Sequence, residues 1–90
     1  MDLNITLAKG ENYLANEIDG EVVMMNIETG LYVSLNNTGK VIWDMLDTPK
    51  SIESLINLLV DTYKITHEQC TTDVVPFIEQ MMQQEILVKK

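Results

Sequence analysis

The amino-acid sequence predicts an α+β fold in which a three-stranded antiparallel sheet comes first and three helices follow. Two observations carry this prediction. Short segments of strand-like residues, separated by Gly-containing turns, fill the chain up to Leu35. Apolar residues then recur at helical spacing in three segments that begin near Asn36, Ser51 and Thr66. A meander of three strands has little core of its own, so we expect the helices to cover it.

Length and composition fit one small cytoplasmic domain. The chain has 90 residues, of which 46% are hydrophobic, and this is enough for one modest core. No apolar run reaches the roughly 18 residues of a membrane span, and the N-terminus lacks the pattern of a secretion signal. The single cysteine excludes an intramolecular disulfide and fits a reducing compartment. We therefore expect a cytoplasmic protein without a membrane partner.

The first predicted strand follows a weakly patterned segment. Residues 1–12 are mostly polar, so we expect them to be loosely ordered, and we place a single domain in residues 13–90. Tyr13–Ile18 is predicted as a strand. Asp19-Gly20 is typical of a two-residue turn in which both residues have positive φ, and it predicts a hairpin with the next segment.

Two further strands complete the predicted meander. Glu21–Ile27 has apolar residues on both faces, which indicates a strand that is covered on both sides, at least in part. Glu28-Thr29-Gly30 fits a hairpin loop with its glycine in the left-handed conformation. In the third strand, Leu31–Leu35, the odd-numbered residues are expected to face the core, and Tyr32 and Ser34 to face away. The far edge of this strand has no predicted partner.

The helices are predicted from their capping residues and apolar stripes. The N-terminal caps are Asn36 or Asn37, Ser51 and Thr66. Thr66 forms a capping box with Gln69 for a third helix over His67–Gln84. Trp43 of the first helix is expected to pack in the core. Pro76 removes a backbone N–H, so the third helix is expected either to kink there or to begin near Thr71–Thr72.

The apolar arc of the third helix is wider than that of an ordinary surface helix. Its core stripe consists of Cys70, Val74, Phe77 and Met81, and further apolar residues widen the arc to roughly 160°. Those further residues are Val75, Ile78 and Met82. Two interpretations stay open, namely a deeply packed helix or one wall of an apolar groove. Beside the free edge of Leu31–Leu35, such a groove would suit β-strand addition, in which a peptide pairs with the edge and its side chains enter pockets.

Catalytic and metal-binding interpretations find little support in the sequence. His67 and Cys70 are one helical turn apart, but Cys70 lies on the core stripe and His67 in the first turn of the helix. One cysteine and one histidine do not make a tetrahedral metal site. The fourteen carboxylates are scattered, and no Gly-rich phosphate loop is present. We expect no enzymatic activity, no cofactor and no metal.

The charge balance argues against nucleic acid as a partner. Six lysines and no arginine oppose the acidic residues, and the formal net charge is −8. A short sheet with three helices resembles a DNA-binding winged helix, but the third helix has no cation between His67 and Glu85 to face phosphate. The charge favours basic partners instead. Tyr32 is either an ordinary cross-strand aromatic or a contact for an added peptide.

Three segments together resemble the PqqD-like family. The run LNNTGKVIWDMLD, Leu35–Asp47, is similar to the family's strand end and first helix. SIESLINLLVDTYKI and DVVPFIEQMMQQEIL are similar to its second and third helices. The resemblance covers residues 18–88. It implies a winged helix-turn-helix-like fold and a RiPP recognition element, a non-catalytic protein that binds the leader of a ribosomally made precursor peptide and presents it to a maturation enzyme.

The resemblance also implies a binding site and partners. The leader is expected to add as a strand beside Leu31, Tyr32, Val33, Ser34 and Leu35, against a pocket wall formed by Val75, Ile78, Glu79 and Met82. The chain is most similar to the freestanding leader-binding proteins of lasso-peptide gene clusters, because Glu28-Thr29 replaces the Pro-Glu that is usual in pyrroloquinoline quinone synthesis. The expected enzyme partner is then a leader-cleaving cysteine protease. The protein itself is expected to be a monomer or a weak edge-paired dimer.

Two alternatives stay open. One is a chaperone that presents a precursor peptide to a radical SAM enzyme, and the other is a winged-helix adaptor that binds a protein. Two residues depart from the family pattern. Pro76 is unusual within the third helix, and Glu85 stands where a helix-ending glycine is common.

Overall fold

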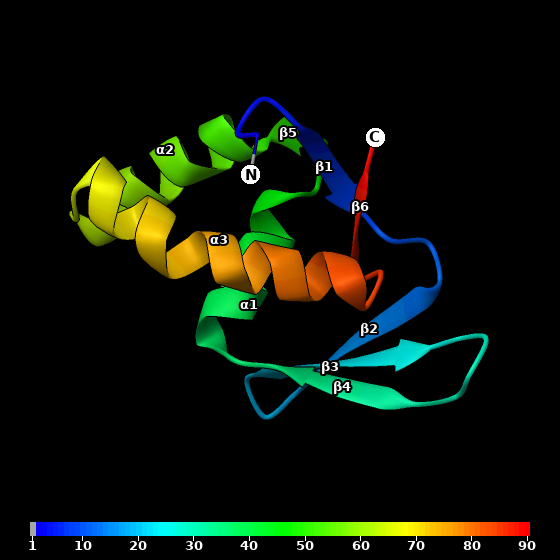
Figure 1. Ribbon diagram of the computed structural model, residues 1–90. Coiled ribbons are helices and arrows are strands. Elements are labelled where there is room, and N and C mark those ends of the chain that lie inside the picture. The colour runs from blue at the N-terminus through cyan, green and yellow to red at the C-terminus, as the bar shows by residue number, and fades with distance from the viewer. Residues whose placement is uncertain (1) are drawn as a thin grey trace.

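The computed structural model describes residues 2–90 and contains two small sheets and three helices (Figure 1). The strands are β1 Thr6–Lys9, β2 Tyr13–Ile18, β3 Glu21–Asn26, β4 Tyr32–Leu35, β5 Lys50–Ser51 and β6 Leu87–Lys89. The helices are α1 Asn37–Met45, α2 Ile52–Tyr63 and α3 His67–Gln83. The predicted α+β class, with a three-stranded antiparallel sheet and three helices, is confirmed. The likeness to a winged helix-turn-helix stays a prediction.

The larger sheet is the predicted meander, with strand order β2-β3-β4. The turn between β2 and β3 has φ of 53° at Asp19 and 82° at Gly20, as the two-residue hairpin requires. Gly30, before β4, has φ of 72°. Asn26 stabilises this second loop, because its side-chain oxygen accepts hydrogen bonds from the N–H groups of Glu28 and Thr29.

The core face of this sheet differs in part from the prediction. Val22, Met24 and Leu35 are buried, as alternation requires. Leu31 was expected to face the core, but 68% of its surface is exposed and it lies before β4 begins. The prediction for Leu31 was therefore wrong, because the loop after β3 extends one residue further than the apolar pattern indicates.

A second sheet, of order β5-β1-β6, has no counterpart in the sequence prediction. Residues 1–12 were expected to be loosely ordered, yet β1 is the central strand of this sheet and Leu7 is fully buried. β1 pairs with residues that follow it by more than 40 positions, for example Leu7 with Lys50 and with Lys89. A strand held by such distant partners carries little local signal. The fold therefore begins before Tyr13.

The three helices begin at predicted caps. The side chains of Asn36, Ser51 and Thr66 each accept a hydrogen bond from a backbone N–H in the first turn. α3 begins at His67 and continues through Pro76, so the alternative start near Thr71–Thr72 was wrong.

The end of α3 is a Schellman motif in which a glutamate replaces the usual glycine. Glu85 has φ of 59°. Its N–H donates to the carbonyl oxygen of Met82, and the N–H of Ile86 donates to that of Met81. The motif turns the chain sharply from α3 into β6.

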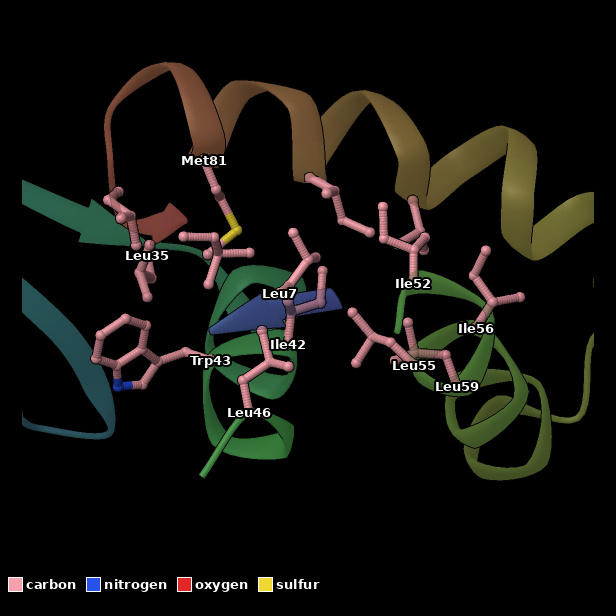
Figure 2. Packing of buried hydrophobic residues seen from close by; sticks show 14 of the residues in the cluster. Leu7, Leu35, Ile42, Trp43, Leu46, Ile52, Leu55, Ile56, Leu59 and Met81 are labelled. Atoms are coloured by element: carbon pink, nitrogen blue, oxygen red, sulfur yellow. The ribbon is translucent and has the colours of Figure 1, made fainter. Parts of the chain in front are cut away.

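One hydrophobic cluster joins both sheets and all three helices. Figure 2 shows Met81 reaching from α3 toward the layer that holds Leu35 and Trp43. Trp43 is buried, as predicted, and the ammonium group of Lys9 lies 4.7 Å from the centre of its ring. This packing fixes α3 above the core face of the larger sheet, which is the arrangement that creates the candidate site.

Candidate functional site

One edge of β4 presents backbone groups that have no partner strand within residues 2–90. β4 pairs with β3 on one side, and the N–H of Asn26 donates to the carbonyl oxygen of Leu31 at 2.8 Å. Hydrogen-bonded residues alternate along an antiparallel ladder, so the next residue of β4 that bonds to β3 is Val33. The N–H and C=O groups of Tyr32 and Ser34 therefore point away from β3, toward the open edge.

A cleft of about 330 Å³ lies between this edge and α3. Its lining residues come from β4, the start of α1 and the C-terminal half of α3, and they are Val33, Ser34, Leu35, Asn36, Gly39, Phe77, Gln80, Met81 and Gln84. Phe77 is half-buried against the core cluster, so its ring forms a firm wall. None of these lining residues is ionisable. The cleft therefore suits an apolar or neutral polar side chain, with Gln80 and Gln84 as amide hydrogen-bonding groups.

The helix residues that were predicted to line this cleft lie elsewhere. Ile78 is fully buried in the core. Val75 lines a separate cleft of about 320 Å³ with Leu3 and Pro76. Glu79 is exposed, and Met82 packs partly buried against the core cluster. The prediction that these residues form the wall opposite β4 is corrected by this placement.

The error has a simple geometric cause. The buried residues of α3 form a central stripe, and the apolar arc extends beyond it to Phe77 on one side and to Val75 and Met82 on the other, so periodicity does not tell which side faces the sheet. The sequence pattern was interpreted with Val75 and Met82 facing β4. The structure turns the side of Phe77 toward β4, because Met81 packs against the layer of Leu35. Phe77 was missed because it stands at the border of the predicted core stripe, and the apolar period alone does not show whether a border residue is buried or accessible.

The outer face of the same sheet is rich in exposed apolar side chains. Leu14, Met25 and Tyr32 are aligned across three strands on this face. Leu14 is 53% exposed and Tyr32 71% exposed, and Ile18 adds 56% at the end of β2. Tyr32 therefore stands on the solvent side, next to the open edge. An apolar face of this kind is typical of a surface that contacts another molecule.

A larger and shallower hollow lies on α2. Its volume is about 890 Å³, and its lining residues are Ser54, Asn57, Leu58, Val60, Asp61, Lys64 and Ile65. No strand edge borders it, and the lining includes two charged side chains. The smaller cleft beside β4 is the better candidate, because it combines unpaired backbone groups with apolar walls.

The two residues considered for catalysis do not share a site. Cys70 is fully buried, and burial raises the pKa of its thiol above the ordinary value. A neutral buried thiol is a poor nucleophile. His67 lies at the surface, where its Nε2 is 2.9 Å from a carboxylate oxygen of Glu53 on α2. This contact joins the first turns of two helices.

The described part of the chain contains neither a metal-ligand cluster nor a membrane-spanning helix. Among residues 2–90, no three His, Cys, Asp or Glu side chains gather to hold a metal ion. No helix in the same range is long and apolar enough to cross a bilayer.

The fold is similar to that of a solved peptide complex. A solved structure of TbiB1 in complex with the TbiA(beta) leader peptide superposes on this chain with a TM-score of 0.77 and 25% sequence identity. The match covers 89% of this chain and 93% of that one. Comparison with curated proteins finds no match.

The family follows from the sequence match. Residues 21–87 match the family described as Coenzyme PQQ synthesis protein D (PqqD), and this range runs from β3 to the first residue of β6. The chain therefore belongs to the PqqD family. The resemblance seen in the LNNTGKVIWDMLD run and in the two following helices is confirmed.

Proposed function

We propose that this protein binds the leader segment of a ribosomally made precursor peptide by β-strand addition along β4. The observation that carries the proposal is the open edge at Tyr32 and Ser34, which borders the cleft lined by Phe77 and Met81. An incoming strand would satisfy the outward backbone groups and extend the sheet β2-β3-β4 to four strands. The PqqD family match and the similarity to a structure that contains a leader peptide support it.

The residues of β4 have two different roles in this proposal. Tyr32 and Ser34 supply the backbone hydrogen bonds, whereas Val33 and Leu35 contribute side chains to the cleft. The leader is expected to be disordered when free, so ordering it opposes binding. Backbone pairing is tolerant of sequence, and the cleft then selects leaders that place an aromatic or aliphatic side chain beside Phe77.

The proposed outcome of binding is delivery of the leader to a maturation enzyme in the cytoplasm. We place the protein with the freestanding leader-binding proteins of lasso-peptide clusters, whose partner is a leader-cleaving cysteine protease. Its loop from Glu28 to Gly30 lacks the Pro-Glu that is usual in pyrroloquinoline quinone synthesis. The exposed apolar face with Leu14 and Tyr32 borders the open edge, so it offers the enzyme a contact surface beside the bound leader. Presentation to a radical SAM enzyme is the second candidate within the same mechanism.

The proposal is tested by titrating the purified protein into a fluorescein-labelled leader peptide from the precursor gene beside its own gene. We expect a saturable rise in anisotropy, with micromolar or tighter affinity. Ser34→Pro removes an outward N–H and leaves the bonds to β3 in place, so it is expected to weaken binding strongly in a folded protein. Ser34→Ala is the matched control, because it keeps the N–H and is expected to bind normally.

Val33 is the wrong position for such a test. Its N–H points toward β3, so Val33→Pro would break the sheet itself. A protein that binds no leader, or a Ser34→Pro variant that binds like the original, would contradict strand addition at β4. Failure to bind any leader, together with a stable dimer in sedimentation experiments, would favour the alternative of a protein-binding adaptor.

A further inference from the structure

Tyr13 makes a direct hydrogen bond between the larger sheet and the end of α3. It is the first residue of β2, and its ring lies on the core face, partly buried against the hydrophobic cluster. Its hydroxyl donates to the carbonyl oxygen of Gln84 at 2.7 Å. Gln84 is the C-terminal cap of α3 and also lines the cleft beside β4. The hydroxyl of Tyr13 is therefore hydrogen-bonded to the end of the helix that forms the cleft wall, although Tyr13 itself does not line the cleft.

Besides packing on α2 and β6, the C-terminal part of α3 meets the core face of the larger sheet toward both β4 and β2. Toward β4, Met81 packs in the layer that holds Leu35 (Figure 2). Toward β2, the C-terminal cap of α3 accepts the hydrogen bond of Tyr13. A helix is stiff over this length, and a shift of its C-terminal end therefore moves Phe77 and Gln80 relative to the edge of β4.

The segment between β1 and β2 supports the same helix end. The N–H of Gly10 donates to the carbonyl oxygen of Ile86 at 2.8 Å, and a Cβ at Gly10 would collide with the carbonyl oxygen of Glu85. The backbone thus approaches the Schellman turn closely on one side, and the hydroxyl of Tyr13 holds it on another.

The side-chain hydrogen bonds between the larger sheet and the helices lie away from the open edge of β4. Within residues 2–90, two side-chain hydrogen bonds link the larger sheet to a helix or its cap, and both involve a side chain of β2. One is that of Tyr13 to α3, and the other joins Glu17 to Lys40 of α1 at 2.8 Å. β4 has no such tie in this range, so an incoming strand meets no side-chain bond that must first break.

We infer that Tyr13 is a positioning residue for peptide binding, because its hydrogen bond to Gln84 sets the separation between the α3 wall and the edge of β4. The inference rests on the proposed function, and it adds that the Tyr13–Gln84 hydrogen bond fixes the width of the cleft. When the bond is absent, α3 samples positions in which the cleft is too wide or too narrow. The apparent affinity falls with the fraction of molecules in the competent arrangement.

The direct test compares Tyr13→Phe with Tyr63→Phe by anisotropy titration of the same labelled leader. Tyr13→Phe removes one oxygen and keeps the ring that packs against the core. We expect its dissociation constant to rise about threefold to tenfold, the range that corresponds to one lost hydrogen bond. Tyr63 is on α2, is 43% exposed and does not line the cleft, so Tyr63→Phe is expected to bind like the original protein.

A second readout separates positioning from a purely structural role. Spin labels at Tyr32→Cys and Gln83→Cys report the distance between β4 and α3, and fully buried Cys70 is shielded from the labelling reagent. We expect a broader distance distribution when Tyr13→Phe is added, and a narrower one after leader binding. If Tyr13 only stabilises the fold, Tyr13→Phe will lower the unfolding midpoint and leave both the distances and the affinity unchanged.

The outcomes distinguish this inference from the proposed function. If the original protein does not bind the leader, the proposed function fails first. If the original protein binds, and Tyr13→Phe binds equally well with an unchanged distance distribution, strand addition survives and the positioning role of Tyr13 is overturned.

Discussion

Phe77 and Ile78 are neighbours in the chain, but Phe77 belongs to the proposed site and Ile78 to the core. Successive helical residues point about 100° apart, so Phe77 lines the cleft beside β4 while Ile78 is fully buried. We predict that Phe77→Ala mainly loses peptide affinity, and that Ile78→Ala mainly loses stability.

The magnitudes follow from burial. Replacing a fully buried isoleucine by alanine costs about 2–5 kcal/mol of unfolding free energy. Native domains have about 0.05–0.15 kcal/mol of stability per residue, so this loss is a large share of the total for a chain of 90 residues. The unfolding midpoint of Ile78→Ala should fall by at least about 10 °C. Phe77 is half-buried, so Phe77→Ala should cost less than about 3 kcal/mol. Loss of an aromatic anchor should weaken the leader about tenfold or more.

The assay pairs urea unfolding, followed by far-UV circular dichroism, with leader titration at a temperature where both variants are folded. We expect Phe77→Ala to lose more leader affinity than Ile78→Ala, and Ile78→Ala to lose more unfolding free energy than Phe77→Ala. If Phe77→Ala binds the leader normally, while folded Ile78→Ala does not, the wall of the site lies on the side of α3 that the sequence indicated, and the placement argued from the structure is wrong.

Three further predictions follow from local contacts and from charge. Gly10→Ala should lower the unfolding free energy by about 2 kcal/mol or more, because its Cβ would meet backbone atoms of Glu85. Gly39→Ala, within α1, should be neutral or stabilising by up to about 1 kcal/mol. Urea midpoints that rank the two variants in the reverse order would refute this. The hydrogen bond and charge of Lys9 lower the pKa of Asp47 below its ordinary value of 3.8. The stability from this pair is therefore present above that value and is lost as pH falls through the folded pKa. Asp47→Asn should show a shallower loss of stability in acid titrations, and an unchanged slope would contradict this. The association rate of a basic leader should fall as salt is raised, because the net charge is −8, and a salt-independent rate in stopped-flow experiments would exclude steering.

Features that depend on a few neighbouring residues were predictable from the sequence. The caps at Asn36, Ser51 and Thr66 and the turn at Asp19-Gly20 were all found where expected. In each case one capping side chain, or two adjacent residues with positive φ, decides the conformation, so the signal lies within four residues. A free edge was likewise predicted from the order of strands, over Leu31–Leu35, and the structure has this edge on β4, Tyr32–Leu35.

Features that depend on distant partners were not predictable. β1 is stabilised by pairing with β5 and β6, and these strands have two and three residues of their own. The side of α3 that faces β4 is decided by the packing of Met81, which the apolar period does not reveal. The first error concerns strands that are too short to detect from sequence. The second concerns the orientation of a helix that was itself correctly predicted.

Hydrogen exchange of the backbone amides of β4 tests the central claim most directly. The N–H of Val33 is already bonded to β3, whereas those of Tyr32 and Ser34 point to the open edge. We therefore predict that, in the free protein, Tyr32 and Ser34 exchange fast and Val33 slowly, and that saturating leader peptide slows exchange at one or both of the outward amides. Leader binding that leaves Tyr32 and Ser34 exchanging as fast as in the free protein would contradict strand addition at this edge.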